Sequence, residues 1–312
     1  MTTLAVPVRS RWWRIALVAV AGAAAVVVLR GRLPDTGAVL AAAQAADVRW
    51  AALAVLAQTL SQAMFARQQR QLLTAFGVGI SPLRALAISY SRSAISMALP
   101  AGSAVSAAFA FQQFRVRGAS RSTAATVAIL SGVASTVGLV VLYAALPVVA
   151  RPWLAIPAAA LLGGAAWSAV HVARTWRPAR LPRWRVLAQL ANLAREARAV
   201  PARHWVATIA FAAANWLLDL ACLAAVTHAC GLTVGYGELA TVYLAAQVAR
   251  QIPLTPGGIG LIETSLLTGL VAAGAAQTGA AAAVLGYRII SFWLILPVGL
   301  TTYLGLRRQL EK

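Results

Sequence analysis

Five charged residues stand inside long apolar stretches of this chain: Arg92, Asp219, Arg250, Glu263 and Arg288. A charge at membrane depth is costly unless it meets a partner or a wet cavity, so each of these residues is a functional candidate. Pairing Glu263 with Arg250 or Arg288 would lower the cost of burying both partners. The arginine left over would then be available to an anion such as a phosphate.

Two interrupted apolar segments, half the chain apart, resemble each other. One reads Tyr90-x9-Pro100-Ala101-Gly102-Ser103, and the other reads Tyr243-x9-Pro253-Leu254-Thr255-Pro256-Gly257-Gly258. A helix broken at membrane depth frees N–H and C=O groups, and it is tolerated only where it is buried in protein or lines a wet cavity. Paired breaks in corresponding halves point to a transporter-like binding site between repeats. The alternative is that both breaks are packing kinks.

A glycine run after the second break favours binding of an anion. Gly257, Gly258 and Gly260 let a ligand approach the backbone closely, and the helix that follows starts with free N–H groups and the positive end of its dipole. The first segment offers a smaller set of matching residues: Gly102, Ser103, Ser106 and Arg92. We therefore expect the two breaks to form one anion-binding site.

Other residue types give weaker signals. Asp219 has two interpretations, as a proton relay or as a group that hydrogen-bonds neighbouring helices. The three histidines lie at the ends of apolar stretches without the spacing of metal ligands: His171, His204 and His228. The sequence contains no nucleophile elbow, phosphate-binding loop or dinucleotide glycine motif. We expect no catalytic residues, no metal, no cofactor and no enzyme activity.

The composition is that of an integral membrane protein, because 61% of the 312 residues are hydrophobic and the mean hydropathy is +0.76. The net charge of +20 is carried by arginines between apolar spans, which favours a membrane surface over nucleic acid as the partner. The stretches long enough to cross a bilayer are Trp12–Leu29, Trp50–Ala66, Thr123–Leu146, Trp153–Val172, Trp205–Thr227 and Ala280–Leu304. The two interrupted segments, Ala85–Phe114 and Leu239–Ala275, are too long for one crossing and short for two.

The arginines favour a re-entrant hairpin for each interrupted segment. If each hairpin enters and leaves the membrane on one side, most basic residues fall in the cytoplasm, and only Arg30, Arg32, Arg49 and Arg151 fall outside. This distribution follows the positive-inside rule and places both termini in the cytoplasm. The two hairpins then enter from opposite sides, so the halves form an inverted repeat.

The fold predicted from these patterns is an all-α polytopic protein of the cytoplasmic membrane. It has about six full transmembrane helices plus two re-entrant helical hairpins arranged as an inverted repeat. Residues 1–312 form a single transmembrane domain, with a first half 1–172, a basic cytoplasmic connector 173–204 and a second half 205–312.

Two stretches of the second half resemble the signature of the lysylphosphatidylglycerol synthase transmembrane-region family, whose members are also described as flippase-like proteins. They read Leu254-Thr255-Pro256-Gly257-Gly258-Ile259-Gly260-Leu261-Ile262-Glu263, and Tyr287-Arg288-Ile289-Ile290-Ser291-Phe292-Trp293 followed by Pro297. The resemblance covers nearly the whole chain and implies a polytopic inner-membrane protein. In the first half many relatives carry an Arg and a Gly-Glu after the Pro, whereas the stretch from Pro100 to Ser106 has neither charge.

Some family members are joined to an aminoacyltransferase that makes lysyl-phosphatidylglycerol, and their transmembrane part is associated with moving that lipid. We expect this domain, and with it synthase activity, to be absent here. The leading hypothesis is a lipid translocase for a phospholipid or a polyprenyl-linked glycolipid. The alternative is a non-transporting membrane accessory that presents lipid-linked substrate to a cell-envelope glycosyltransferase. The expected substrate-binding residues are Arg92, Pro100, Gly102, Ser103, Arg250, Pro256, Gly257, Gly258, Gly260, Glu263, Tyr287 and Arg288.

Overall fold

The computed structural model describes residues 36–99, 102–150, 195–196, 198, 200–250 and 255–308. Every regular element within these ranges is a helix, as the sequence predicts. The predicted spans Trp12–Leu29 and Trp153–Val172 lie outside the described residues, as does most of the connector 173–204.

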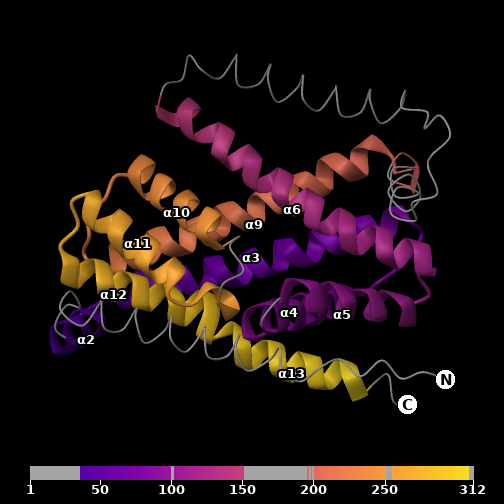
Figure 1. Ribbon diagram of the computed structural model, residues 1–312, viewed down its shortest axis with the longest axis horizontal. Helices are drawn as coiled ribbons and strands as arrows, with labels where there is room; N and C mark the ends of the chain where they lie inside the picture. Colours follow the sequence, from indigo (N-terminus) through magenta and orange to yellow (C-terminus); the bar gives the residue numbers. More distant parts are fainter. Residues whose placement is uncertain are drawn as a thin grey trace, which may run out of the picture.

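The described helices follow the same order in both halves of the chain (Figure 1). Each half has a long helix, two shorter helices separated by a break, and another long helix. The elements of the first half are α2 (Thr36–Gln44), α3 (Val48–Ala75), α4 (Pro82–Ala98), α5 (Gly102–Val116) and α6 (Arg121–Ala150). Those of the second half are α9 (Ala202–Ala229), α10 (Tyr236–Arg250), the short η2 (Pro256–Gly258), α11 (Leu261–Ala272), α12 (Gln277–Arg288), the π-helical η3 (Ile289–Trp293) and α13 (Ile295–Arg308).

Three helices in the described part of the chain are long and apolar enough to cross a bilayer: α6, α9 and the continuous run from α12 to α13. A fourth span results if α2 and α3, which meet at a bend of 87°, are taken together. The predicted spans Thr123–Leu146, Trp205–Thr227 and Ala280–Leu304 fall within the first three helices, and Trp50–Ala66 falls within α3. The structure therefore agrees with a helical membrane protein.

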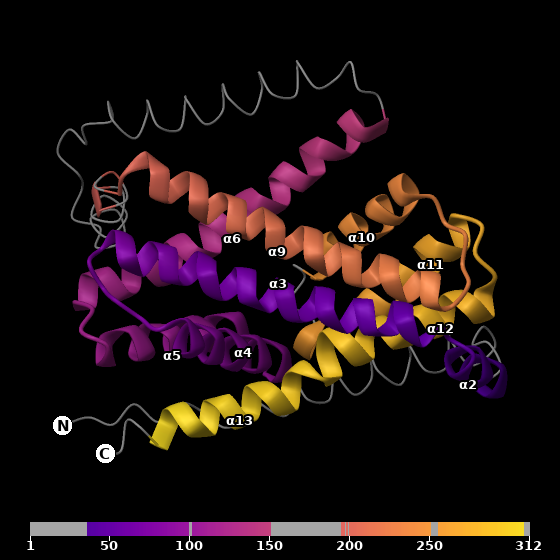
Figure 2. The same ribbon diagram turned by 180° about the vertical axis from the view of Figure 1, so that it is seen from behind.

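Helices α3 and α9 share the most extensive contact between any two described helices, and they run antiparallel (Figure 2). Hydrogen bonds at one end, at the centre and at the other end join Asp47 to Ala229, Ser61 to Asn215, and Gln71 to His204. The residue numbers of these contacts rise along α3 and fall along α9. The first long helices of the two halves are thus related by a reversal of direction about the Ser61–Asn215 contact.

Each interrupted segment forms a helical hairpin. Helices α4 and α5 pack against each other, and so do α10 and α11. The sequence accounts for the start of α4, because Ser81 accepts a hydrogen bond from the Arg84 N–H and Pro82 occupies the first turn. Pro100 and Ala101, at the first break, lie outside the described residues, as do residues 251–254 before the second break.

The ends of the two hairpins meet. Helix α4 contacts η2 directly, and Gly257 of η2 lies against the carbonyl of Met97 near the end of α4. A Cβ atom at Gly257 would stand 3.0 Å from that carbonyl oxygen and 2.3 Å from Cε2 of Phe292. The φ angle of Gly257 is +60°, which lies in the left-handed region that glycine adopts without strain. The described residues that flank the two breaks therefore meet in the fold.

Two hydrophobic clusters hold the hairpins in position. One joins α3, α9, α10, α11 and α12, and its fully buried members include Leu223, Leu266 and Leu270. The other joins α3, α4, α5, α6 and the end of α13, and it includes Leu72, Ile88 and Phe114. Each hairpin thus has its own apolar base.

Gly299 allows α13 to approach α4, and it gives a test of this packing. A Cβ atom at Gly299 would lie 2.3 Å from Cβ of Ala94 and 2.5 Å from the carbonyl oxygen of Tyr90. We expect Gly299→Ala to lower the free energy of unfolding by about 1–3 kcal/mol, because the helices must separate. Gly305→Ala, on the same helix with open space around it, should leave stability unchanged or raise it by about 0.5–1 kcal/mol. Thermal unfolding in detergent measures both, and equal effects would contradict the packing.

Candidate functional site

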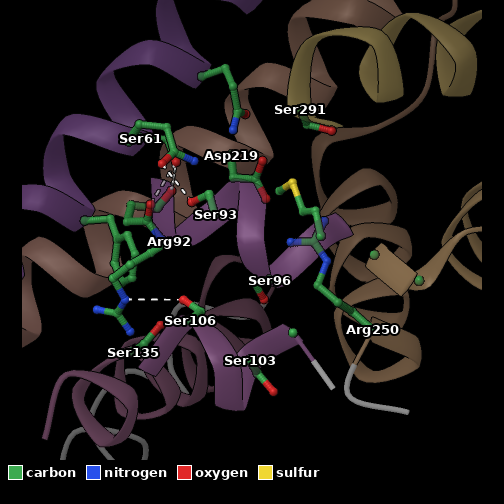
Figure 3. Close-up of a pocket in the computed structure, with 18 of the residues that line it drawn as sticks. Ser61, Arg92, Ser93, Ser96, Ser103, Ser106, Ser135, Asp219, Arg250 and Ser291 are labelled. Atoms are coloured by element: carbon green, nitrogen blue, oxygen red, sulfur yellow. Dashed lines mark hydrogen bonds between the residues drawn. The ribbon is translucent and has the colours of Figure 1, made fainter. Parts of the chain in front are cut away.

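A polar cavity of about 370 Å³ lies where the hairpin ends meet α3, α9 and η3 (Figure 3). Its charged lining residues are Arg92, Asp219, Arg250 and Arg288. Neutral polar side chains complete the lining: Gln58, Ser61, Gln62, Ser93, Ser96, Ser103, Ser106, Ser135, Asn215, Thr255 and Ser291. So many hydrogen-bonding groups inside a helical membrane protein mark a place built for a polar or charged ligand.

Glu263 is paired with Arg288, as one of the two sequence alternatives predicts. The Arg288 Nε atom donates to Glu263 Oε1 at 2.6 Å, and Arg288 is only 3% exposed. The same guanidinium donates to the Gly257 carbonyl at 3.4 Å, and it stacks over the ring of Phe292 at 4.4 Å. These contacts tie α11, α12 and the broken backbone together.

The glycine run uses two of its own N–H groups internally, and this corrects the anion site expected from the sequence. The Gly260 N–H donates to Glu263 Oε2 at 2.7 Å, and the Gly258 N–H donates to the Thr255 carbonyl at 3.2 Å. Gly260 also has a φ of +88°, so the residue before α11 is glycine for conformational reasons. The carboxylate of Glu263 already occupies the start of α11, the place where an external anion was expected.

Asp219 lies at the side of the cavity formed by α9, α10 and α12. Its Oδ2 accepts from the hydroxyl of Tyr243 at 2.8 Å, and both of its oxygens lie 3.2 Å from the hydroxyl of Tyr287. Asp219 is 6% exposed, and Arg250 lies within electrostatic reach of it. The hydrogen-bonding interpretation of Asp219 is therefore confirmed, and the proton relay stays a prediction.

Arg92 reaches the cavity with a single side-chain hydrogen bond among the described residues. It is 8% exposed, its Nε donates to Ser106 at 3.4 Å, and its guanidinium lies 5.2 Å from the ring of Phe65. Its Nη1 has no hydrogen-bond partner among the described residues. Figure 3 shows Arg92 and Arg250 reaching the cavity from different hairpins.

The charges do not cancel. Glu263 neutralises Arg288, and Asp219 stands near Arg250, so within the described site Arg92 is left without a carboxylate. The sequence predicts that the surplus charge lies on Arg250 or Arg288, whereas in the structure it lies on Arg92 of the first hairpin. Arg92 therefore makes that hairpin positive, although its break carries no charge.

Most of the expected residues meet at the cavity. Those that line it are Arg92, Gly102, Ser103, Arg250, Gly257, Gly258 and Arg288. Three expected residues do not line the cavity: Gly260, Glu263 and Tyr287. Gly260 donates to Glu263, Glu263 accepts from Arg288, and Tyr287 donates to Asp219. Pro256 belongs to η2, and Pro100 lies outside the described residues.

Helix α3 contributes residues to the cavity that were not predicted from the sequence. Gln58, Ser61, Gln62 and Phe65 line the cavity from one face of this helix. The available signal is that the polar residues Gln58, Ser61 and Gln62 recur at helical spacing, three and four residues apart, within the apolar first part of α3. No group of three or more His, Cys, Asp or Glu side chains gathers in the described ranges in a way that could hold a metal ion.

The fold and the site define a polytopic helical membrane protein with a buried, polar, positively charged cavity between two helical hairpins. The chain matches the family described as the lysylphosphatidylglycerol synthase TM region over residues 12–299, and it belongs to that family. It is also similar to a UPF0104 membrane protein of Methanothermobacter thermautotrophicus, with 31% identity over 84 residues. That alignment covers 27% of this chain and 25% of the relative, so the chain matches about a quarter of that protein.

A double-mutant cycle tests the ion pair between Glu263 and Arg288. Because the two groups share one buried contact, we expect the free-energy changes of Glu263→Gln and Arg288→Gln to be non-additive by about 0.5–3 kcal/mol in unfolding experiments. Glu238→Gln, which removes an exposed carboxylate from α10, should change stability by less than about 0.5 kcal/mol. Additive single effects at positions 263 and 288 would show that the pair is not formed.

Proposed function

We propose that this protein is a lipid translocase of the cytoplasmic membrane. The headgroup of a phospholipid or a polyprenyl-linked glycolipid enters the cavity, while the apolar chains stay in the bilayer beside the helices. The observation that carries this proposal is Arg92, a buried cation with an unpartnered Nη1, in a cavity where two helix breaks meet. A phosphate oxygen is the acceptor that such a guanidinium binds best.

The reversal between α3 and α9 supports an inverted repeat. If the first helices of the halves run in opposite directions through the bilayer, their crossing at Ser61 and Asn215 lies near the midplane. Both residues line the cavity, which then also lies near the midplane. Substrate sites of secondary transporters occupy this position, between repeats and beside broken helices.

The lengths of the hairpin helices support re-entrant hairpins rather than full crossings. Helix α4 has 17 residues and α11 has 12, which correspond to about 25 Å and about 18 Å. The hydrocarbon core is about 30 Å thick, so neither helix is long enough to cross it alone without mismatch. The positive-inside rule then assigns both termini to the cytoplasm, as expected from the arginines.

The accessory hypothesis shares the same cavity but not the same outcome. An accessory would bind the headgroup and present it to a cell-envelope glycosyltransferase without moving it between leaflets. We propose transport because a site between inverted halves is reached from either side by small movements of one half against the other. Neither role includes catalysis, in line with the expectation of no enzyme activity.

Translocation in proteoliposomes tests the proposal. The protein is reconstituted with fluorescent phosphatidylglycerol or a fluorescent polyprenyl phosphate, and a membrane-impermeant quencher reports the outer-leaflet fraction over time. We expect protein-dependent movement of at least one of these lipids, and Arg92→Gln should slow it about tenfold or more. That factor corresponds to the loss of one charge-assisted hydrogen bond, about 1.5–3 kcal/mol.

The matched control is Arg67→Gln, which removes an exposed arginine from α3 and should leave the rate unchanged. Lipid binding with no protein-dependent movement would favour the accessory role. Equal rates for wild type and Arg92→Gln would remove Arg92 from the substrate site.

A further inference from the structure

We infer that Asp219 is a proton-binding site coupled to anion binding at Arg250, so that one proton enters the cavity with each anionic headgroup. This inference rests on the proposed function and adds the ion that drives it. It is carried by the arrangement of three groups: the carboxylate of Asp219 and the guanidinium of Arg250, which both line the cavity, and the tyrosine hydroxyls that hold the carboxylate.

In the free site Asp219 is arranged as a carboxylate. Both of its oxygens accept from tyrosine hydroxyls, and Gln247 donates a further, longer hydrogen bond at 3.5 Å. An ionised carboxylate only accepts hydrogen bonds, so all of these donors fit the charged form. Burial of a lone negative charge is costly, and the nearby cation that offsets it is Arg250.

The charges around Asp219 explain why an anion would change its protonation. The titratable or charged side chains that face it are Cys222 from α9, Tyr243 and Arg250 from α10, Tyr287 and Arg288 from α12, and, across the cavity, Arg92 from α4. Arg288 is already paired with Glu263. A phosphate held between Arg92 and Arg250 competes with Asp219 for the charge of Arg250 and brings a second anion into the cavity. Two buried anions sharing one cation favour uptake of a proton by one of them.

The cavity also supplies a route for the proton. Three buried polar atoms have no hydrogen-bond partner among the described residues: Gln247 Oε1 beside Asp219, and Gln58 Oε1 and Ser291 Oγ in the lining of the cavity. Buried polar groups of this kind are satisfied by ordered water. Gln58 and Ser291 both line the cavity, so water can connect Asp219 to the solvent that enters with the headgroup.

The step conserves both protons and charge. A proton from bulk water binds Asp219, a monoanionic headgroup binds Arg250, and the net charge of the cavity stays the same. When the headgroup leaves, Asp219 regains Arg250 as its partner and releases the proton. Because binding linkage is reciprocal, a proton gradient across the membrane would then bias the direction in which the anionic lipid moves.

Proton uptake on binding is measured by calorimetry. Detergent-solubilised full-length protein is titrated with dihexanoyl-phosphatidylglycerol, a phosphodiester that does not itself titrate near neutral pH, in two buffers of different ionisation enthalpy. The difference between the two heats gives the protons taken up per lipid bound. We expect about one proton for the wild type at pH 7.5, and close to zero for Asp219→Asn. Glu238→Gln, which removes an exposed carboxylate from the same hairpin, should keep the wild-type value.

Each result has one meaning. Lipid binding without proton uptake overturns the coupling and leaves the proposed function standing, whereas absence of binding overturns both. Uptake that persists in Asp219→Asn overturns the assignment to Asp219. If Asp219→Asn does not fold, Asp219→Glu keeps the carboxyl group. Its infrared difference spectrum on lipid addition should then show the protonated-carboxyl band at a shifted frequency, and an unshifted band would assign the proton elsewhere.

Discussion

The constraint on which this structure depends is that a broken helix within a membrane protein leaves polar groups that lipid cannot satisfy. The second break solves this problem mainly with its own sequence. Arg288 donates to the carbonyl of Gly257, Glu263 accepts from the N–H of Gly260, and the two side chains bind each other. One ion pair thereby holds a hairpin, a π-helical turn and a long helix in fixed relation. A π-helical turn widens the helix locally and is frequent at functional sites, and here it carries Ser291 into the cavity.

The two hairpins are similar in shape but differ in electrostatics. The charges of the second are neutralised by neighbouring helices, since Glu263 of α11 pairs with Arg288 of α12, and Asp219 of α9 stands near Arg250. The first carries Arg92 with a serine and an aromatic ring as its described partners. Because, in the described part of the site, only the first hairpin carries a positive charge without a carboxylate partner, an added negative charge has a defined place beside Arg92. This asymmetry also explains why the break after Leu99 can lack charged residues, because its positive charge comes from α4, a helix turn or more earlier in the chain.

Sequence reasoning finds the elements and the breaks because both follow from local chemistry. Apolar runs of sufficient length predict α6 and α9, and Pro and Gly predict the interruptions. The sequence left two possible partners for Glu263, Arg250 and Arg288. It shows that a buried carboxylate needs a cation, but it does not show which cation lies nearer. The choice of Arg288 depends on how α11 packs against α12. The internal use of the Gly260 N–H was missed for a similar reason, since it depends on the rotamer of Glu263.

The contribution of α3 shows a second limit. Gln58, Ser61 and Gln62 are ordinary residues whose importance appears only when α3 is placed against α9 and the hairpin ends. Contacts between residues about 150 positions apart, such as Ser61 with Asn215, are set by tertiary packing and leave little trace in a single sequence. Asp219 was only partly predictable. Its position in an apolar run is evident from the sequence, whereas its two tyrosine partners are evident only from the structure.

The central claim is that both hairpins serve one headgroup site, with Arg92 on one side and Arg250 on the other. An experimental structure of the protein in nanodiscs containing phosphatidylglycerol tests this claim most directly. The account predicts density for a phosphate inside the cavity, within hydrogen-bonding distance of Arg92 and of Arg250. An empty cavity with ordered lipid confined to the outer surface of the helices would contradict it.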